Sequence, residues 1–161
     1  MARLTSTKCL VFASLMGALS FAMQMFVPGI PVGLAKVELA DVPAVLGAAF
    51  TNQIGGVLVG FLYGLGSRLP QYSIPLSMFG FSLLGYLAKK LKMGWMAIPI
   101  VRGFVHPLLG SIVIKVLYYG PAVPLEPILI RVFINYIPGA VISVPLYIFI
   151  EKKIPWIRLL R

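Results

Sequence analysis

The chain has 161 residues, of which 60% are hydrophobic and 11% are charged, and its mean hydropathy is +0.98. A soluble domain of this length cannot bury so much apolar surface, whereas a helical membrane protein can turn it toward lipid. The formal net charge is +10, and the single cysteine, Cys9, excludes an internal disulfide and any cysteine-based metal motif.

We predict an all-α integral membrane protein that forms a single membrane domain over residues 1–161. About six transmembrane helices of ~20 residues each would account for this length, so we predict a bundle of six transmembrane helices. Proline and glycine residues after the first helix end it. The second helix begins at Asp41, whose carboxylate can cap free backbone amides, with Pro43 in its first turn. The predicted spans cover approximately 8–27, 41–50, 54–66, 71–88, 95–119 and 128–150. The second and third are shorter than ~17 residues, so we expect them to be tilted, half-inserted or shielded by neighbouring helices.

The lysine and arginine residues are unevenly distributed between the two ends of this predicted bundle. With the N-terminus inside, nine of the 14 fall on the inner side and two, Lys36 and Arg68, fall on the outer side. Membrane proteins carry such an excess on the cytoplasmic side, where anionic lipids attract it. We therefore predict that both termini are cytoplasmic.

The other three cations lie within predicted spans, where a charge is costly and needs an explanation. Arg131 and Asn135 are four residues apart near the outer end of the last span, and therefore lie on one helix face. They could contact a ligand from outside. Alternatively, Arg131 reaches outer lipid headgroups and Asn135 bonds a neighbouring helix.

Arg102 and His106 share a similar spacing in the fifth span. His106 lies near the membrane midplane and either contacts a ligand or bonds a nearby carbonyl, while we expect Arg102 to reach the inner surface. Lys115 lies about 180° around the helix from His106 and either reaches the outer boundary or lines the pocket. Tyr119, at the outer boundary, completes the candidate ligand site.

Two stripes of small residues recur at four-residue spacing, which permits close helix contact in lipid. The first consists of Ser14, Ala18 and Ala22 in the first span, and the second includes Gly56, Gly60 and Gly64 in the third. Each stripe either packs within the chain or docks a partner subunit in the membrane. We expect at least one of them to pack internally.

The loop before Asp41, the D-V-P-A helix start, the short second helix and the glycine-rich third helix resemble the S component of energy-coupling factor (ECF) vitamin transporters. The local match covers residues 38–47, and the layout matches over most of the chain. The resemblance implies a high-affinity vitamin-binding subunit in the plasma membrane of a prokaryote. It implies a ligand pocket on the outer side, lined by the last three helices and the loop after the first. Ala18 and Ala22 would contact a transmembrane T component, and two ATPase subunits would drive uptake.

The sequence also bears on other functions. It contains no G-x-x-x-x-G-K-[ST] loop, so we expect no nucleotide hydrolysis by this chain, and we predict no enzyme activity, cofactor or metal site. A stand-alone secondary carrier or channel remains an alternative, although the four carboxylates fall at loop or span ends and a coupled carrier usually needs a buried one. A lipid-modifying enzyme could use only His106 with Ser111. In-membrane cations would suit a ligand with a carboxylate or phosphate.

Overall fold

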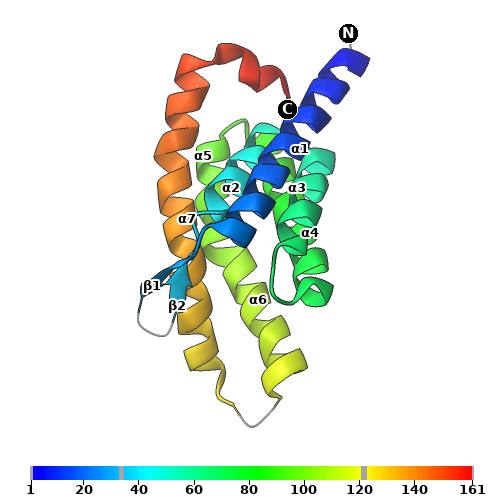
Figure 1. Ribbon diagram of the computed structural model, residues 1–161. Helices are drawn as coiled ribbons and strands as arrows, with labels where there is room; N and C mark the ends of the chain where they lie inside the picture. The colour runs from blue at the N-terminus through cyan, green and yellow to red at the C-terminus, as the bar shows by residue number, and fades with distance from the viewer. Residues whose placement is uncertain (1, 33–34, 121–122, 161) are drawn as a thin grey trace.

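The computed structural model describes residues 2–32, 35–120 and 123–160, most of which are helical (Figure 1). The α-helices are α1 (Ala2–Phe26), α2 (Asp41–Phe50), α3 (Gln53–Leu65), α4 (Pro70–Leu91), α5 (Gly94–Ile100), α6 (His106–Ile114) and α7 (Leu125–Lys153). Two π-helical turns, η1 (Val101–Val105) and η2 (Lys115–Tyr119), continue α5 and α6, and a 3-10 helix, η3 (Pro155–Leu160), follows α7. Strands β1 (Ile30–Val32) and β2 (Ala35–Val37) form a short antiparallel hairpin after α1, in which Ile30 pairs with Val37.

Within the described residues, three stretches are long and apolar enough to cross a membrane, namely Thr7–Phe26, Gly94–Leu117 and Leu125–Lys153. The helices form six segments at the predicted places, because α5, η1, α6 and η2 follow one another without a break. However, α2 and α3 have only 10 and 13 residues. Helix α4 has 22 residues but is not among the three stretches that are also sufficiently apolar. The structure therefore shows an apolar helical protein with three candidate spans among the described residues.

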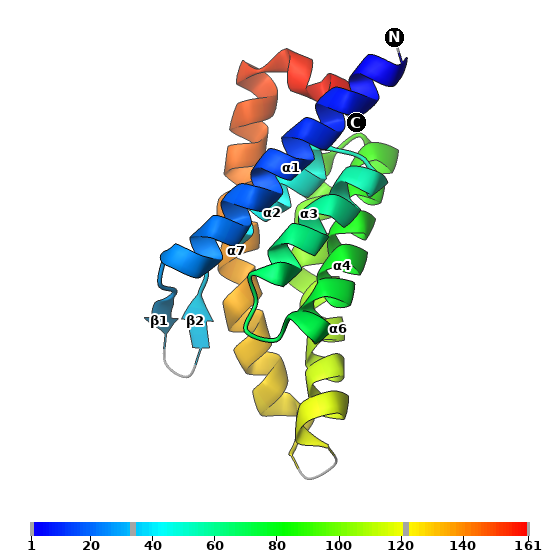
Figure 2. The ribbon, with the colours of Figure 1, turned by 45° about the vertical axis from the view of Figure 1, so that its right-hand side comes forward.

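The short helix α2 forms the centre of the bundle. Nine of its ten residues are buried, and it contacts α1, α3, α4, α5 and α7. Helix α1 crosses in front of it, and α3 and α4 lie side by side next to it (Figure 2). Neighbouring helices therefore replace lipid around α2, which is one of the arrangements expected for so short an apolar helix.

The glycine stripe of α3 is the site of its close contact with α4. Methyl groups added to Gly56, Gly60 or Gly64 would overlap α4 at Phe81, Ser77–Met78 and Ile74. Gly56 and Gly60 are buried in this contact. Of the two alternatives for this stripe, the structure therefore shows packing within the chain, and Gly56 and Gly60 are covered by α4 and not available to a partner.

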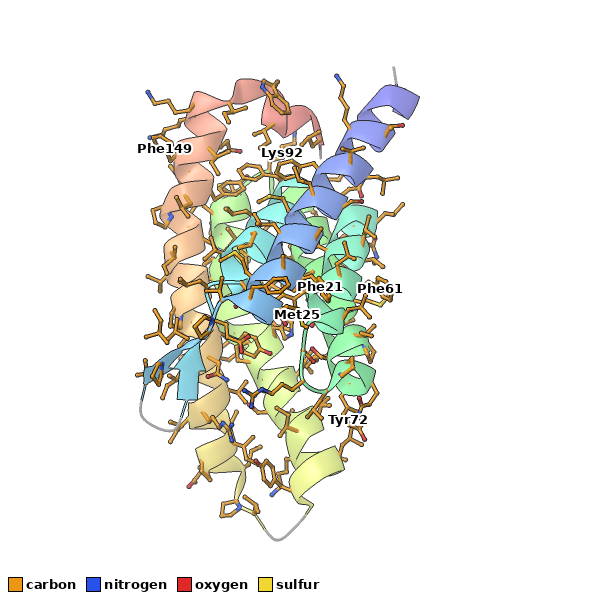
Figure 3. All side chains as sticks on the ribbon, in the orientation of Figure 1. Phe21, Met25, Phe61, Tyr72, Lys92 and Phe149 are labelled. Carbon is orange, nitrogen blue, oxygen red and sulfur yellow. The ribbon has the colours of Figure 1, made fainter. Side chains whose placement is uncertain are left out.

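The two ends of the bundle differ in structure. The start of α1 and the helix η3 lie at one end, and the β-hairpin, η2 and the start of α7 lie toward the other (Figure 1). At the first end, the rings of Phe50 and Tyr147 stack with centroids 4.5 Å apart, and η3 buries Ile157 and Leu160. Outward-facing side chains such as Phe61 and Phe149 are exposed, as lipid contact would require (Figure 3).

Candidate functional site: a polar pocket above a buried ion pair

An ion pair between Asp41 and Arg102 lies in the interior of the bundle. Asp41 is 1% exposed and Arg102 is fully buried. The Arg102 Nε donates a hydrogen bond to Asp41 Oδ2 at 2.9 Å, and Nη2 donates to Oδ1, so the carboxylate is held at both oxygens. Such a fork of two bonds is the strong form of a charge-assisted contact. The expectation that Arg102 reaches the inner surface is therefore wrong, because Asp41 neutralises it inside.

The π-helical turn η1 turns Arg102 and His106 to the same side. The His106 backbone N–H donates to the Val101 carbonyl, five residues earlier, instead of four. The next residue is Pro107, whose ring would collide with the carbonyl of Gly103 in a regular helix. A widened turn relieves this crowding, and π-bulges of this kind are frequent at functional sites.

Aromatic rings and His106 enclose the Arg102 guanidinium. Its central carbon lies 4.2 Å from the ring centroid of Tyr136, 4.7 Å from that of Phe81 and 5.2 Å from that of Tyr63. Nη2 also donates to the Tyr63 hydroxyl at 3.1 Å, and Nη1 contacts His106 Nδ1 at 2.6 Å. Because a guanidinium has only donors, this imidazole nitrogen accepts. Helices α2, α3, α4, η1 and α7 thus meet at one charged group.

A cavity of about 620 Å³ lies on the side of this cluster that faces the hairpin end. Its walls come from the end of α1, the start of α2, the α3–α4 turn, the start of α4, and α6 and α7. Met25 of α1 and Tyr72 of α4 are two of its lining residues (Figure 3). Its polar lining consists of Gln24, Glu38, Asp41, Tyr63, Ser67, Arg68, Tyr72, Ser73, Asn135 and Tyr136. A volume within ~300–1,000 Å³ suits one small molecule.

The structure places the five predicted ligand residues in different surroundings. Asn135 lines the cavity, whereas Arg131, one helical turn farther out on α7, is exposed and does not. His106 is buried behind Tyr136 and is not part of the cavity wall. Lys115 donates to the Val123 carbonyl at 2.6 Å, and Tyr119 is exposed. Asn135 is thus the one predicted ligand residue that lines this cavity. For Arg131 and Lys115 the alternative without a place in the wall holds, and His106 bonds Arg102 and not a carbonyl.

The groups that sequence reasoning missed are Asp41, Arg102, Tyr63 and Tyr136. The sequence predicts a helix cap for Asp41 and a position at the inner surface for Arg102, but both side chains are buried, where each charge alone would be costly. Pairing the carboxylate at the start of an apolar helix with the cation in another span would have predicted the contact. Asp41 lies at the end of a predicted span, as expected, but it is buried because α2 begins in the interior of the bundle, so the expectation that no carboxylate is buried is wrong.

The predicted docking stripe of α1 has mixed exposure. The face that packs on α2 and α3 consists of Cys9, Ala13, Gly17 and Ser20, all of them buried. On the neighbouring face Ala18 is exposed, and Ser14 and Ala22 are half-buried; the Ser14 hydroxyl donates to the Leu10 carbonyl at 2.8 Å. Of the two predicted stripes, this one therefore includes a small residue that a partner could contact.

No grouping typical of a metal centre or a nucleophilic site is found in the part of the chain that the structure describes. Three or more His, Cys, Asp or Glu side chains never gather there as metal ligands would. Ser111 donates to the Pro107 carbonyl at 2.8 Å, while His106 contacts Arg102, so these two have separate partners. Comparison of the chain with family models, with curated proteins and with solved structures gives no match.

Proposed function

We propose that this protein is the membrane-embedded substrate-binding subunit of an uptake system for a vitamin or related small molecule. In this proposal it works like an ECF S component, with a separate transmembrane T component and two ATPase subunits, in the plasma membrane of a prokaryote. It binds the molecule in the polar cavity and has no enzyme activity of its own.

The observation that carries the proposal is the cavity itself. A space of about 620 Å³ opens at one end of the apolar bundle, and its wall combines ten polar side chains with apolar ones such as Leu76 and Ile114. Its inner boundary includes Asp41, which Arg102 fixes in position, and the pair rests against packed aromatic rings. A preorganised polar wall of this kind is typical of a small-molecule site.

The packing of the other half favours a binding subunit over a channel. Phe50, Leu84, Ile98 and Tyr147 are completely buried and belong to one continuous apolar core. A molecule in the cavity would have to part these side chains to continue through the chain. Movement of the whole subunit against a partner avoids this, and separate ATPases would supply the energy.

The orientation rests on the two ends of the molecule. The end that holds the start of α1 and η3 also carries the exposed residues Lys89, Lys90, Lys152 and Lys153. Exposed Trp95 and Trp156 suit the membrane interface. We place this end in the cytoplasm and the cavity outside. All six helical segments then lie in the membrane, with α2 surrounded by protein.

A second candidate is a stand-alone secondary carrier, which the buried carboxylate of Asp41 favours. A coupling carboxylate must change its charge or partner during transport. Asp41 instead holds a guanidinium that keeps its charge and stays bonded at both oxygens. Purified protein in sealed vesicles separates the two: uptake without partner subunits would establish a carrier and contradict our proposal.

The direct test is binding by the purified protein. Mass spectrometry identifies the small molecule that co-purifies, and calorimetry then compares its affinity for two variants. Asn135→Ala should weaken binding about tenfold, since a hydrogen bond lost from a desolvated site has roughly that effect. Arg131→Ala, one turn away and outside the cavity wall, is the matched control and should bind normally. Absence of any bound molecule, or equal losses in both variants, would contradict the proposal.

A further inference from the structure

The charged groups of the cavity wall are mainly acidic. Glu38 and Asp41 line it together with one described cation, Arg68. Glu38 is half-buried just before α2, whereas Arg68 is exposed in the turn between α3 and α4. Because bulk water screens an exposed charge far more than an enclosed one, the two carboxylates act more strongly inside the cavity than Arg68 does.

Three other described cations, Arg102, Lys115 and Arg131, lie outside the cavity wall. Arg102 is not part of the wall, and its donors contact Asp41, Tyr63 and His106. Lys115 donates to the Val123 carbonyl. Within the described residues, an anionic ligand would therefore meet Arg68 alone, at the exposed rim of the cavity.

The Asp41–Arg102 ion pair is oriented with its carboxylate toward the cavity. Asp41 is part of the cavity wall and Arg102 lies behind it, so the negative end of the pair faces the cavity. The pair is neutral as a whole, but its nearer charge dominates at short range because Coulomb energy falls with distance. Glu38 adds a negative charge on the same side.

The remaining wall suits a planar ring. Tyr63, Tyr72 and Tyr136 contribute aromatic surface to the wall. Gln24 and Asn135 contribute amide groups that can orient a ligand in the cavity. Aromatic faces attract organic cations as well as flat rings. The volume of about 620 Å³ limits the occupant to one molecule of vitamin size.

We propose that the cavity selects a heteroaromatic cation, with its positive group directed at Glu38 and Asp41, over neutral and anionic molecules of the same size. This inference rests on the proposed function and names the chemical class of its ligand. It replaces the expectation from sequence of a carboxylate or phosphate ligand, because the cations behind that expectation do not line the cavity.

The test measures the affinity of the purified chain for thiamin as a heteroaromatic cation, riboflavin as a neutral ring system and pantothenate as an anion, and identifies any co-purified molecule. Of the three probes, we expect only thiamin to bind tightly, and we expect any co-purified molecule to be a cation. Glu38→Gln should weaken cation binding about tenfold, because one charge-assisted contact is lost. Arg131→Gln, the matched neutralisation of an exposed cation outside the cavity wall, should leave the affinity unchanged.

Each other outcome is decisive. Preferential binding of pantothenate, riboflavin or a co-purified anion would overturn the inference and leave the proposed function intact, as would equal cation binding by the wild type and Glu38→Gln. If neither the three probes nor any co-purified molecule binds, the proposed function fails together with this inference. Thermal unfolding of both variants checks that each one is folded.

Discussion

The same helices form one tightly packed half of the bundle and one half that contains a cavity. In the half near η3, Phe50 stacks on Tyr147, and Gly94 lets that tyrosine approach α5, so little space remains. In the other half, the helices separate around a cavity whose wall is polar. The Asp41–Arg102 pair lies between these regions. The comparison indicates that an apolar bundle tolerates a polar cavity where a neutralised ion pair separates it from the packed core.

The largest effect is expected from breaking the ion pair at this boundary. Arg102→Met leaves the Asp41 carboxylate buried and unpaired, which should lower the free energy of unfolding by ~3–5 kcal/mol. Thermal unfolding in detergent measures the loss. The double variant Asp41→Asn with Arg102→Met should recover part of it, because no uncompensated charge remains. Equal stability of Arg102→Met and the wild type would show that the pair does not support the boundary.

A smaller effect should follow from a methyl group in the α3–α4 contact. Gly60→Ala places a Cβ against the α4 backbone at Ser77 and Met78 and should destabilise the protein by ~1–3 kcal/mol. Gly103→Ala is the matched control, since its Cβ would meet only Pro99 at 4.0 Å. The control should be neutral or slightly stabilising, because alanine favours helix. A harmless Gly60→Ala would mean that close packing of α3 on α4 is dispensable.

The smallest effect on stability, within ~0.5 kcal/mol, is expected at the exposed residue Ala18. Ala18→Leu should nevertheless weaken association with a T component at least about tenfold, because added bulk separates helices that must approach closely in lipid. Pull-down of partner subunits measures this, and ligand affinity should stay unchanged. Normal assembly of this variant would remove α1 from the proposed partner interface.

The sequence predicted local features better than long-range ones. Helix α2 begins at Asp41 as predicted, although the Asp41 carboxylate bonds Arg102 and caps no backbone amide, so the expected capping role is wrong. The glycines of α3 form a packing stripe, as their spacing indicated. The partner of that stripe was not predictable, because spacing identifies a helix face but not the surface opposite it. Helix α1, which has 25 residues, buries a face that is shifted by one position from the predicted stripe, so that Ala13 and Gly17 are buried in place of Ser14 and Ala18.

The candidate site was predictable only where one helix defines it. Asn135 lines the cavity, but Arg131 on the same face does not, because one turn along the helix moves the side chain past the rim. The contact of Arg102 with Asp41 joins residues 61 positions apart, and Arg102 lies in the π-helical turn before Pro107. Helical periodicity in the sequence predicts neither the position of the cavity rim along α7 nor the contact between Arg102 and Asp41.

The central claim is that the cavity faces outward and holds the ligand. Its most direct test labels single cysteines in cells with a membrane-impermeant maleimide, in a background where Cys9 is replaced by alanine. A cysteine at Ser67, in the cavity wall, should react from outside and be protected by the bound molecule, while one at the exposed Lys89 should react only after permeabilisation. Labelling of the Ser67 position only after permeabilisation would contradict the account.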